Sequence, residues 1–310
     1  MAMKKFIKQI ILFILIYILI LGINFSLNLY FINTIPPVVN ANTLIIGDSH
    51  PQTAINPKLL NNAENLSQSA EPYFITYFKL KKLLDTNKID TVILGYSYHN
   101  LSAFNDKKFI DSKWSNKMFQ RTYPLISISE LNNLETNNRD YIEILYRNMC
   151  IYPKFKHHDY LGSFKSINYE KKIFDSKPSI KRHFFYKDTN VGISSVAVAY
   201  LDLLIELTEQ NNIKLILLGT PLHKSYLNNI PVNFKKGFEK NKHKILRKHK
   251  DIEVWDYTNK VMEDKFFIGP DHLNNNGSDV FTKLIKVRLQ TVDKRKASPP
   301  LAQKLSAAKK

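Results

Sequence analysis

Cysteine is almost absent from this chain of 310 residues, which contains only Cys150. A single cysteine excludes an internal disulfide and a metal cluster built from several thiolates, so stability must come from the core. Acidic residues are also scarce: 27 Asp and Glu stand against 45 Lys and Arg, a formal net charge of +18. The positive charges form no single block of the kind that binds nucleic acid, and no internal repeat is visible. The hydrophobic content of 44% suffices for one large core or two modest ones.

No Lys or Arg occurs between Lys8 and Lys58, and much of this gap is an apolar run over residues 10–32, broken by two asparagines and one serine. About 20 such residues span a bilayer core. Because lysines precede the run, the positive-inside rule predicts a cytoplasmic N-terminus and an extracytoplasmic remainder. A cleaved signal peptide is the alternative, but the apolar segment is long for one and a poor cleavage site follows it. We expect residues 1–32 to contain a single-pass membrane anchor and residues 33–42 to be a linker.

A short β-prone run, Thr43 to Ile46, leads directly into Gly47-Asp48-Ser49. The run is typical of a buried strand, and Pro51 and the residues after it can open a helix or a turn. A serine at such a turn places its hydroxyl at the carboxyl edge of a sheet, where open α/β folds bind ligands. Free backbone N–H groups of the turn can stabilise an oxyanion. A simple surface turn is the alternative.

Further apolar runs alternate with amphipathic segments along the chain. Strands are expected at residues 90–95, 214–219 and 252–257, and helices at residues 73–84, 194–210, 234–250 and 278–289, the last with Ser278 as its N-cap. Strand, helix and strand within one short span are typical of a parallel βαβ unit. The sequence therefore predicts an α/β fold over residues 43–292, a three-layer α/β/α sandwich with a parallel sheet.

Residues from about 101 to 190 interrupt this alternation. The region is basic and rich in aromatic residues, and only residues 130–149 have a helical pattern. So long an irregular stretch is usually a lid or a substrate-binding insertion. Packing of the aromatic side chains onto the core is a second interpretation, and the two are compatible. After it the chain resumes the alternation and ends in a polar tail, residues 293–310, that we expect to be disordered.

Two short motifs resemble a known family. Gly47-Asp48-Ser49, and Asp271-His272-Leu273-Asn274 with Gly277, resemble the first and last blocks of the SGNH (GDSL-like) hydrolase superfamily. Residues 65–69 resemble the second block, and residues 95–100 lie where the third is expected. The resemblance implies a flavodoxin-like sandwich. A single anchor before such a domain is similar to the envelope acyl-transfer proteins of that superfamily, which include the D-alanyl transfer protein of teichoic acid synthesis and the alginate acetylation proteins.

The resemblance implies a role for each matching residue. Ser49 would be the nucleophile, and His272 would be the base that takes its proton. The acid of the family lies three residues before the histidine, where this chain has Gly269. Asp271 can orient the imidazole only if the loop bends differently. Otherwise a backbone carbonyl holds the histidine in a weaker Ser-His dyad.

The residues that would hold the oxyanion also depart from the family pattern. The second block normally offers a glycine N–H, and Ser67 or Ser69 stands in its place here. Either would serve, because a backbone donor does not depend on its side chain. The third-block asparagine is absent from its usual position, where Ser97 stands, so Asn100 is the nearest amide.

Several other histidines are candidates with simpler alternatives. His50 adjoins the nucleophile and is a candidate for facing the substrate. His99 and His223 lie just past strand ends, at the active-site edge, where solvated loop histidines are also common. The pair His157-His158 has no carboxylate pair nearby and is weak metal-ligand spacing. We expect no metal and no cofactor.

These features predict a bacterial, extracytoplasmic serine O-acyltransferase or esterase that acts on a cell-envelope glycan through an acyl-Ser49 intermediate. The resemblance implies a membrane-bound O-acyltransferase as its partner. A basic exported domain favours anionic envelope polymers and lipid, and nucleic acid would lie on the other side of the membrane. The alternatives are a plain esterase, a catalytically weak or inactive docking partner of the membrane acyltransferase, and a glycan-binding module that uses the aromatic insertion. A neighbouring membrane acyltransferase gene would favour transfer or docking.

Overall fold

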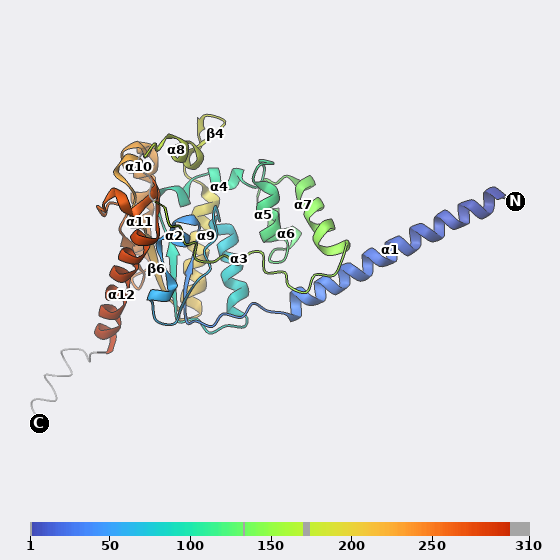
Figure 1. The fold of residues 1–310 in the computed structure, drawn as a ribbon, viewed down its shortest axis with the longest axis horizontal. Helices are drawn as coiled ribbons and strands as arrows, with labels where there is room; N and C mark the ends of the chain where they lie inside the picture. The colour runs from blue at the N-terminus through green and yellow to red at the C-terminus, as the bar shows by residue number, and fades with distance from the viewer. Residues whose placement is uncertain (1, 133, 170–173, 298–310) are drawn as a thin grey trace, which may run out of the picture.

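A five-stranded parallel sheet forms the centre of the computed structural model, which describes residues 2–132, 134–169 and 174–297. The strand order is β2-β1-β3-β6-β7 (Figure 1). Its strands are β1 (Thr43–Ile46), β2 (Ala63–Asn65), β3 (Thr91–Gly95), β6 (Lys214–Gly219) and β7 (Glu253–Asp256). All but β2 follow from the apolar runs of the sequence. The sequence does not reveal β2 because it is short, largely polar and at the sheet edge.

The central strands are buried on both faces, which is why they read as continuous apolar runs. Leu44 and Val92 face a core shared with α3 (Tyr73–Leu84), α9 (Ser195–Gln210) and α11 (Val232–Lys248). Ile45 and Ile93, one residue further along each strand, face a second core shared with α12 (Asn275–Ala297) and with Ala54 of α2 (Ser49–Ala54). A core on each face of the sheet makes the fold the predicted three-layer α/β/α sandwich.

Two predicted helix boundaries need comment. Ser194 caps α9, where its Oγ accepts a hydrogen bond from the N–H of Ala197 at 2.8 Å. The prediction of Ser278 as a cap is wrong, because α12 already begins at Asn275 and Asn274 Oδ1 accepts from Gly277 N at 3.0 Å. The helix continues beyond the expected domain end at residue 292, and residues 298–310 of the predicted tail lie outside the described residues.

The insertion consists of short helices and one small hairpin, stacked beside the sandwich (Figure 1). The helix expected over residues 130–149 is broken into three pieces, because Asn137 starts a new helix by accepting from Asp140 N. Phe109, Phe119 and Phe184 belong to the core, so many of its aromatic residues do pack onto the sandwich. The elements are η2 (Tyr98–Leu101), α4 (Phe104–Lys107), α5 (Ser115–Thr122), α6 (Ile128–Leu131), α7 (Asn138–Leu145), η3 (Tyr146–Cys150), α8 (Lys177–Phe184), β4 (Phe185–Tyr186) and β5 (Thr189–Asn190).

Five further short elements lie in the connections between the strands of the sheet and before the last helix, α12. A 3-10 turn, η1 (Pro57–Leu59), leads into β2, and α10 (Lys224–Asn229) follows β6. After β7 the chain forms η4 (Asp264–Phe266) and the hairpin β8 (Phe267–Gly269) and β9 (His272–Leu273). This hairpin precedes α12 and carries the C-terminal motif.

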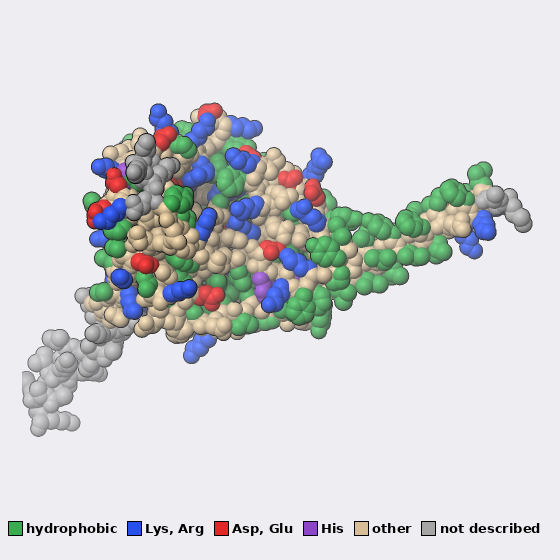
Figure 2. All heavy atoms as spheres, viewed as in Figure 1, with side chains coloured by type: hydrophobic (Ala, Val, Ile, Leu, Met, Phe, Trp, Pro, Cys, Tyr) green, Lys and Arg blue, Asp and Glu red, His purple; other side chains and the backbone are tan. Residues whose placement is uncertain are grey.

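The N-terminal helix α1 (Ala2–Thr34) is long and apolar enough to cross a membrane, and apolar side chains cover most of it in Figure 2. At 1.5 Å per residue it is longer than the roughly 30 Å of a bilayer core. Asn24 Nδ2 donates to Cys150 O at 3.0 Å, and Asn28 Nδ2 donates to Met149 O and Tyr152 O at 2.9 Å. The two asparagines therefore fix the end of the helix to the insertion.

The expected linker is also held in place. Val39 N donates to Asn87 Oδ1 at 2.8 Å, and Asn87 Nδ2 donates to Pro37 O at 2.9 Å. Asn87 follows α3, so the chain between the apolar helix and β1 lies against the sandwich. The anchor and the domain are thus joined by side-chain contacts as well as by the backbone.

Candidate active site

Ser49 lies at the turn from β1 into α2, at the carboxyl edge of the sheet. Gly47 has φ +132°, and a Cβ there would lie 3.1 Å from Pro51 Cγ and 3.2 Å from Gly95 N, so only glycine suits the position. Asp48 caps α2 by accepting a hydrogen bond from His50 N at 2.9 Å. The turn therefore leaves Ser49 as the first residue of the helix, with its hydroxyl exposed at the sheet edge.

His272 reaches Ser49 from the hairpin of β8 and β9. Gly269 pairs with His272, which leaves Pro270 and Asp271 as the two turn residues. His272 Nε2 lies 2.8 Å from Ser49 Oγ, and Asp271 Oδ1 lies 3.1 Å from His272 Nδ1. The tight turn thus brings neighbouring side chains together, and the carboxylate of Asp271 stands beside the imidazole.

Asp271 is almost completely buried and has further partners. Its oxygens accept from Ser179 Oγ at 3.2 Å and from Arg182 Nη2 at 3.3 Å, both on α8 of the insertion. Burial acts to raise the pKa of Asp271, but the contact with His272 and, beyond it, the nearby rings of His183 and His50 hold this pKa well below the usual range. The carboxylate is therefore ionised where it faces the histidine.

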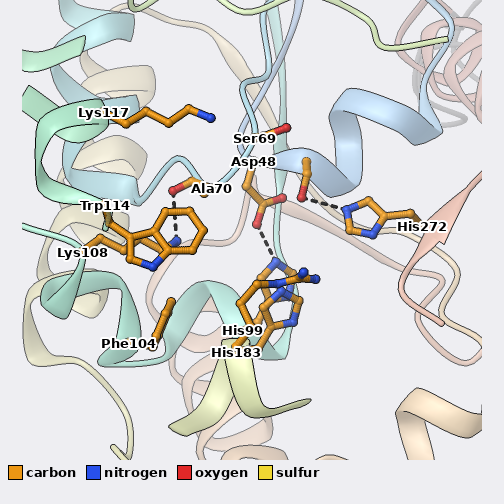
Figure 3. Close-up of a pocket in the computed structure, with 12 residues that line it drawn as sticks. Asp48, Ser69, Ala70, His99, Phe104, Lys108, Trp114, Lys117, His183 and His272 are labelled. Carbon is orange, nitrogen blue, oxygen red and sulfur yellow. Dashed lines mark hydrogen bonds and ion pairs between the residues drawn. The ribbon is translucent and has the colours of Figure 1, made fainter. Parts of the chain in front are cut away.

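In front of these residues is a cavity of about 280 Å³, shown in Figure 3. Phe104 and Trp114 form an aromatic wall on the side opposite His272, and Lys108 and Lys117 come from the same part of the insertion (Figure 3). Arg182 also lines the cavity. The insertion thus supplies aromatic surface and positive charge to a cavity whose reactive groups come from the sandwich.

Lys108 is buried at one side of this cavity. Its Nζ donates to Ala70 O at 3.0 Å and to Asn105 Oδ1 at 2.7 Å, and no carboxylate lies within hydrogen-bond distance of it among the described residues. Burial lowers the pKa of Lys108 to about 7, although the charge of Asp48 acts in the opposite direction. The ammonium group is therefore close to its titration point at neutral pH.

Of the candidate oxyanion donors, Ser69 lines the cavity and Ser67 does not. Ser67 is fully buried and its N–H donates to Asn65 Oδ1 at 3.0 Å, so the expectation for Ser67 is not met by this geometry. Among the described residues, the backbone N–H groups of Ser49 and Ser69 have no hydrogen-bond acceptor. These two donors can serve an oxyanion next to Ser49.

Asn100 has a different place from the one expected. Its Nδ2 donates to Asp48 Oδ2 at 2.9 Å and its Oδ1 accepts from Ser97 N at 2.7 Å. These bonds hold the amide against Asp48, and Asn100 lies outside the cavity lining. Asp48 in turn braces the turn that carries Ser49.

The histidines are distributed differently from the expectation. His99 does line the cavity, and so does His183 of α8, which the sequence analysis misses because an irregular insertion offers no pattern to place it. His50 is buried behind them and is not part of the cavity wall, so it does not face a substrate. His223 lies elsewhere, with Nε2 3.2 Å from Asp264 Oδ1. His157 lies against the anchor, with Nε2 3.0 Å from Asn28 Oδ1.

Burial controls the charge of this group. It lowers the pKa of both His50 and His183 far below the usual value, and the neighbouring His99 acts in the same direction, so both imidazoles are neutral at physiological pH. Burial alone would raise the pKa of Asp48, but its contact with His99 Nε2 at 2.5 Å and the hydrogen bond that it accepts from His50 N bring this pKa well below normal. Asp48 is therefore a buried carboxylate held by His99 and Asn100.

Comparisons with known proteins add little to this geometry. No protein-family model matches the chain, and no curated protein matches it. Among solved structures, it is similar to a "putative acylhydrolase" from Bacteroides fragilis, with 11% identity, a TM-score of 0.39 and coverage of 83% of this chain and 90% of that one. It is also similar to a "putative platelet activating factor" from Streptococcus pneumonia, with 12% identity, a TM-score of 0.43 and coverage of 93% of this chain and 99% of that one. A "GDSL-like lipase" from Bacteroides thetaiotaomicron has 11% identity, a TM-score of 0.39 and coverage of 85% of this chain and 95% of its own. These TM-scores are too low to assign an activity.

Proposed function

We propose that this protein is a membrane-anchored serine acyltransferase or esterase of the SGNH type, which works through an acyl-Ser49 intermediate. One observation carries the proposal: His272 Nε2 lies 2.8 Å from Ser49 Oγ while the Asp271 carboxylate lies 3.1 Å from the other ring nitrogen. Nucleophile, base and orienting acid in this order are what activate a serine hydroxyl at neutral pH. The SGNH-like motifs of the sequence contain Ser49 and His272 at the expected positions, and Asp271 stands two residues after the usual position of the acid.

The residues have defined roles in such a reaction. His272 Nε2 takes the Ser49 hydroxyl proton as Oγ bonds to the acyl carbonyl carbon, and Asp271 stabilises the imidazolium that forms. The N–H groups of Ser49 and Ser69 stabilise the oxyanion. The tetrahedral intermediate then collapses, the bond to the leaving oxygen breaks, and His272 returns the proton to that oxygen. An acceptor hydroxyl, or water, attacks the acyl-Ser49 ester by the same steps in reverse.

The cavity supports an anionic cell-envelope glycan as the acceptor. Phe104 and Trp114 offer flat apolar faces of the kind against which sugar rings pack, and Lys108, Lys117 and Arg182 offer positive charge. A carboxylate or phosphate on the glycan would pair with these cations. Transfer to a glycan hydroxyl is our first choice, and hydrolysis follows if water reaches the intermediate instead.

The apolar helix supports an extracytoplasmic domain that works beside a membrane-bound O-acyltransferase as acyl donor. Lys4, Lys5 and Lys8 precede the helix, and the next basic residue is Lys58. A reporter enzyme that is active only outside the cytoplasm, fused after Leu289, should be active. Activity of a reporter that works only in the cytoplasm would contradict this orientation.

Labelling with a fluorophosphonate tests the chemistry directly. The full chain in detergent should gain one covalent adduct, and Ser49→Ala should gain none while keeping its circular dichroism spectrum. His272→Ala should also abolish labelling, because an unassisted serine hydroxyl is a poor nucleophile. Ser225→Ala is the matched control, since Ser225 lies by His223, outside the cavity lining, and its loss should leave labelling unchanged. A folded wild-type protein that does not label would instead favour a non-catalytic docking or glycan-binding role.

A further inference from the structure

Three histidines that the acyl-transfer chemistry does not use are packed together behind Ser49. They come from three separate segments: His50 from α2, His99 from η2 and His183 from α8. The ring centroids of His50 and His99 are 4.0 Å apart, and those of His99 and His183 are 4.7 Å apart. Figure 3 shows His99 and His183 stacked below Asp48. Since nothing in the proposed mechanism requires these imidazoles, their convergence calls for a separate explanation.

The hydrogen bonds of the cluster leave at least one nitrogen free on each ring within the described part of the chain. His99 Nε2 is held by Asp48 Oδ2 at 2.5 Å, which leaves Nδ1 with no hydrogen-bond partner among the described residues. His183 Nδ1 is held by Tyr226 Oη at 2.5 Å, which leaves Nε2. His50 is buried with neither ring nitrogen hydrogen-bonded within the described part of the chain. Buried polar atoms without a partner are costly, and a bound water or ion is one way to satisfy them.

The three rings bring ligand atoms close together. One nitrogen from each of His50, His99 and His183 lies within 4.8 Å of the other two. Zinc binds imidazole nitrogen at about 2.0–2.1 Å, so the rings, which are close to parallel in the His50–His99 and His99–His183 pairs, must rotate to direct three nitrogens at one ion. Metal-binding histidines typically hand their other N–H to a carboxylate or another acceptor, which fixes the ring and its tautomer. Asp48 on His99 and Tyr226 on His183 occupy these outer positions.

We propose that His50, His99 and His183 bind one divalent transition-metal ion of the zinc type, beside Ser49. Three imidazole nitrogens suit Zn²⁺ and its neighbours and not Ca²⁺ or Mg²⁺, which prefer oxygen ligands. Three protein ligands leave a fourth position open. Because His99 and His183 line the cavity, this position would face it and take a water or a substrate oxygen. The site goes beyond the proposed function, since it can bind metal whether or not Ser49 carries an acyl group.

Besides Asp48, which contacts His99, two charged groups lie at the edge of the cluster and act in opposite directions on a cation. Asp271 Oδ2 lies 3.9 Å from His50 Nε2 and 3.8 Å from His183 Nε2, and its negative charge favours a metal ion. Arg182 disfavours it, but its guanidinium is paired with Asp271 at 3.3 Å and its side chain is 44% exposed. The positive charge of Arg182 is therefore largely neutralised by Asp271 and screened by water. Metal affinity would then depend mainly on the free ring nitrogens.

Metal content and Co²⁺ spectroscopy test the site. The full chain in detergent, stripped with a chelator and dialysed against Zn²⁺, should retain one equivalent by elemental analysis, and Co²⁺ should give the visible absorption of a tetrahedral site. His50→Phe and His99→Phe should abolish both signals. Tyr226→Phe keeps its ring and should weaken metal affinity by about 10–100-fold through the lost outer contact. His243→Ala, which removes an exposed histidine, is the matched control and should leave binding unchanged.

The outcomes separate this site from the acyl-transfer proposal. Ser49→Ala should bind metal like the wild type, so loss of labelling with retained metal would leave the metal site standing. Less than a tenth of an equivalent of Zn²⁺ or Co²⁺ in a folded wild-type protein would overturn it. Stoichiometric binding that survives in both His50→Phe and His99→Phe would place the metal elsewhere and would overturn it equally.

Discussion

A Cβ atom on Gly269 would lie 3.7 Å from Oδ1 of Asp271, the same oxygen that lies 3.1 Å from Nδ1 of His272. The side chain that is missing at residue 269 would therefore point to the place where the Asp271 carboxylate now stands. Gly269 has no positive φ, since the glycines with positive φ in the described residues are Gly47 and Gly192, so an aspartate fits its backbone. The acid is two positions later than in the family pattern, but it faces the same histidine.

The first prediction tests this replacement of one carboxylate by another. Asp271→Asn should lower the rate of fluorophosphonate labelling by about 10⁴-fold, because the amide no longer stabilises the imidazolium. Asp271→Glu should retain some activity. Gly269→Asp added to Asp271→Asn should recover part of the loss, since the new carboxylate enters the same space.

Gly269→Asp alone serves as the control for this experiment. It places two carboxylates side by side, and their repulsion raises a pKa, so labelling should not improve. If Asp271→Asn labels within about tenfold of wild type, a backbone carbonyl or water holds His272 and the Asp271 assignment fails.

The same comparison shows how far a sequence can predict a site. Ser49 and His272 follow from short motifs because a strand-to-helix turn and a C-terminal loop leave local signatures. The sequence makes Asp271 a candidate because it adjoins His272. Only the two-residue turn of the β8–β9 hairpin shows that its carboxylate lies beside the imidazole. His183 is contributed by a short helix in an irregular insertion, and no local pattern places such a helix over a cavity.

The fold divides in a similar way. The three central strands, β1, β3 and β6, are predictable because burial on both faces requires continuous apolar runs, as in Leu215 to Leu218 of β6. The edge strand β2 pairs through its backbone, so Ala63-Glu64-Asn65 carries no apolar signal. The asparagines of the apolar helix are visible in the sequence, but their partners in the insertion depend on tertiary contacts more than 100 residues away along the chain, as between Asn28 and Met149.

A second prediction concerns Lys108 and pH. Its pKa of about 7 in the folded protein is below the value of about 10.4 for an exposed lysine, so the unfolded chain binds more protons between these values. Stability from this group therefore increases as pH rises from about 7 towards 10, and it is reduced below that range. Asp48 opposes this shift, and Arg121 and Arg182 reinforce it.

Lys108→Met should remove that dependence. The melting temperature of the variant should change less with pH over this range than that of the wild type. Affinity for an anionic oligosaccharide should fall in the wild type as pH rises above about 7, and should be low and flat in the variant. Lys117→Met is the comparison, because Lys117 lines the same cavity but is less buried. Identical pH profiles for wild type and Lys108→Met would contradict the assignment.

A third prediction concerns a buried ion pair that supports Ser69. Lys79 Nζ lies 2.7 Å from Glu71 Oε2 and donates to Leu66 O at 2.8 Å, with both charged side chains fully buried. The pair thus holds both ends of the segment that carries Ser69. Lys79→Met should destabilise the protein by about 3–5 kcal/mol, because it leaves the Glu71 carboxylate buried and unpaired.

A double variant separates the charge from the packing. Glu71→Gln combined with Lys79→Met should cost less than Lys79→Met alone, since no unpaired charge remains. Lys82→Met is the matched control on the same helix, because Lys82 lies 3.9 Å from the exposed Asp85 and the change should cost at most about 1 kcal/mol. Chemical denaturation gives the free energy of unfolding of Lys79→Met, of the double variant and of Lys82→Met. Equal losses of this free energy for Lys79→Met and Lys82→Met would refute the role of the buried pair.

The last prediction concerns the junction of the apolar helix with the insertion. Asn28 is fully buried, and in addition to its two donated bonds its Oδ1 accepts from Lys154 N at 2.6 Å. Asn28→Leu keeps the helix apolar but leaves these backbone groups without partners, at about 1–3 kcal/mol for each buried group. Amide hydrogen exchange over residues 149–157 should therefore become faster in Asn28→Leu, measured by mass spectrometry on the full chain in detergent. Ser26→Leu is the control, because Ser26 Oγ bonds only to Gly22 O within its own helix. If both variants exchange like the wild type, the contacts of Asn28 do not stabilise this segment; if only Asn28→Leu exchanges faster, Asn28 holds residues 149–157 of the insertion against the apolar helix.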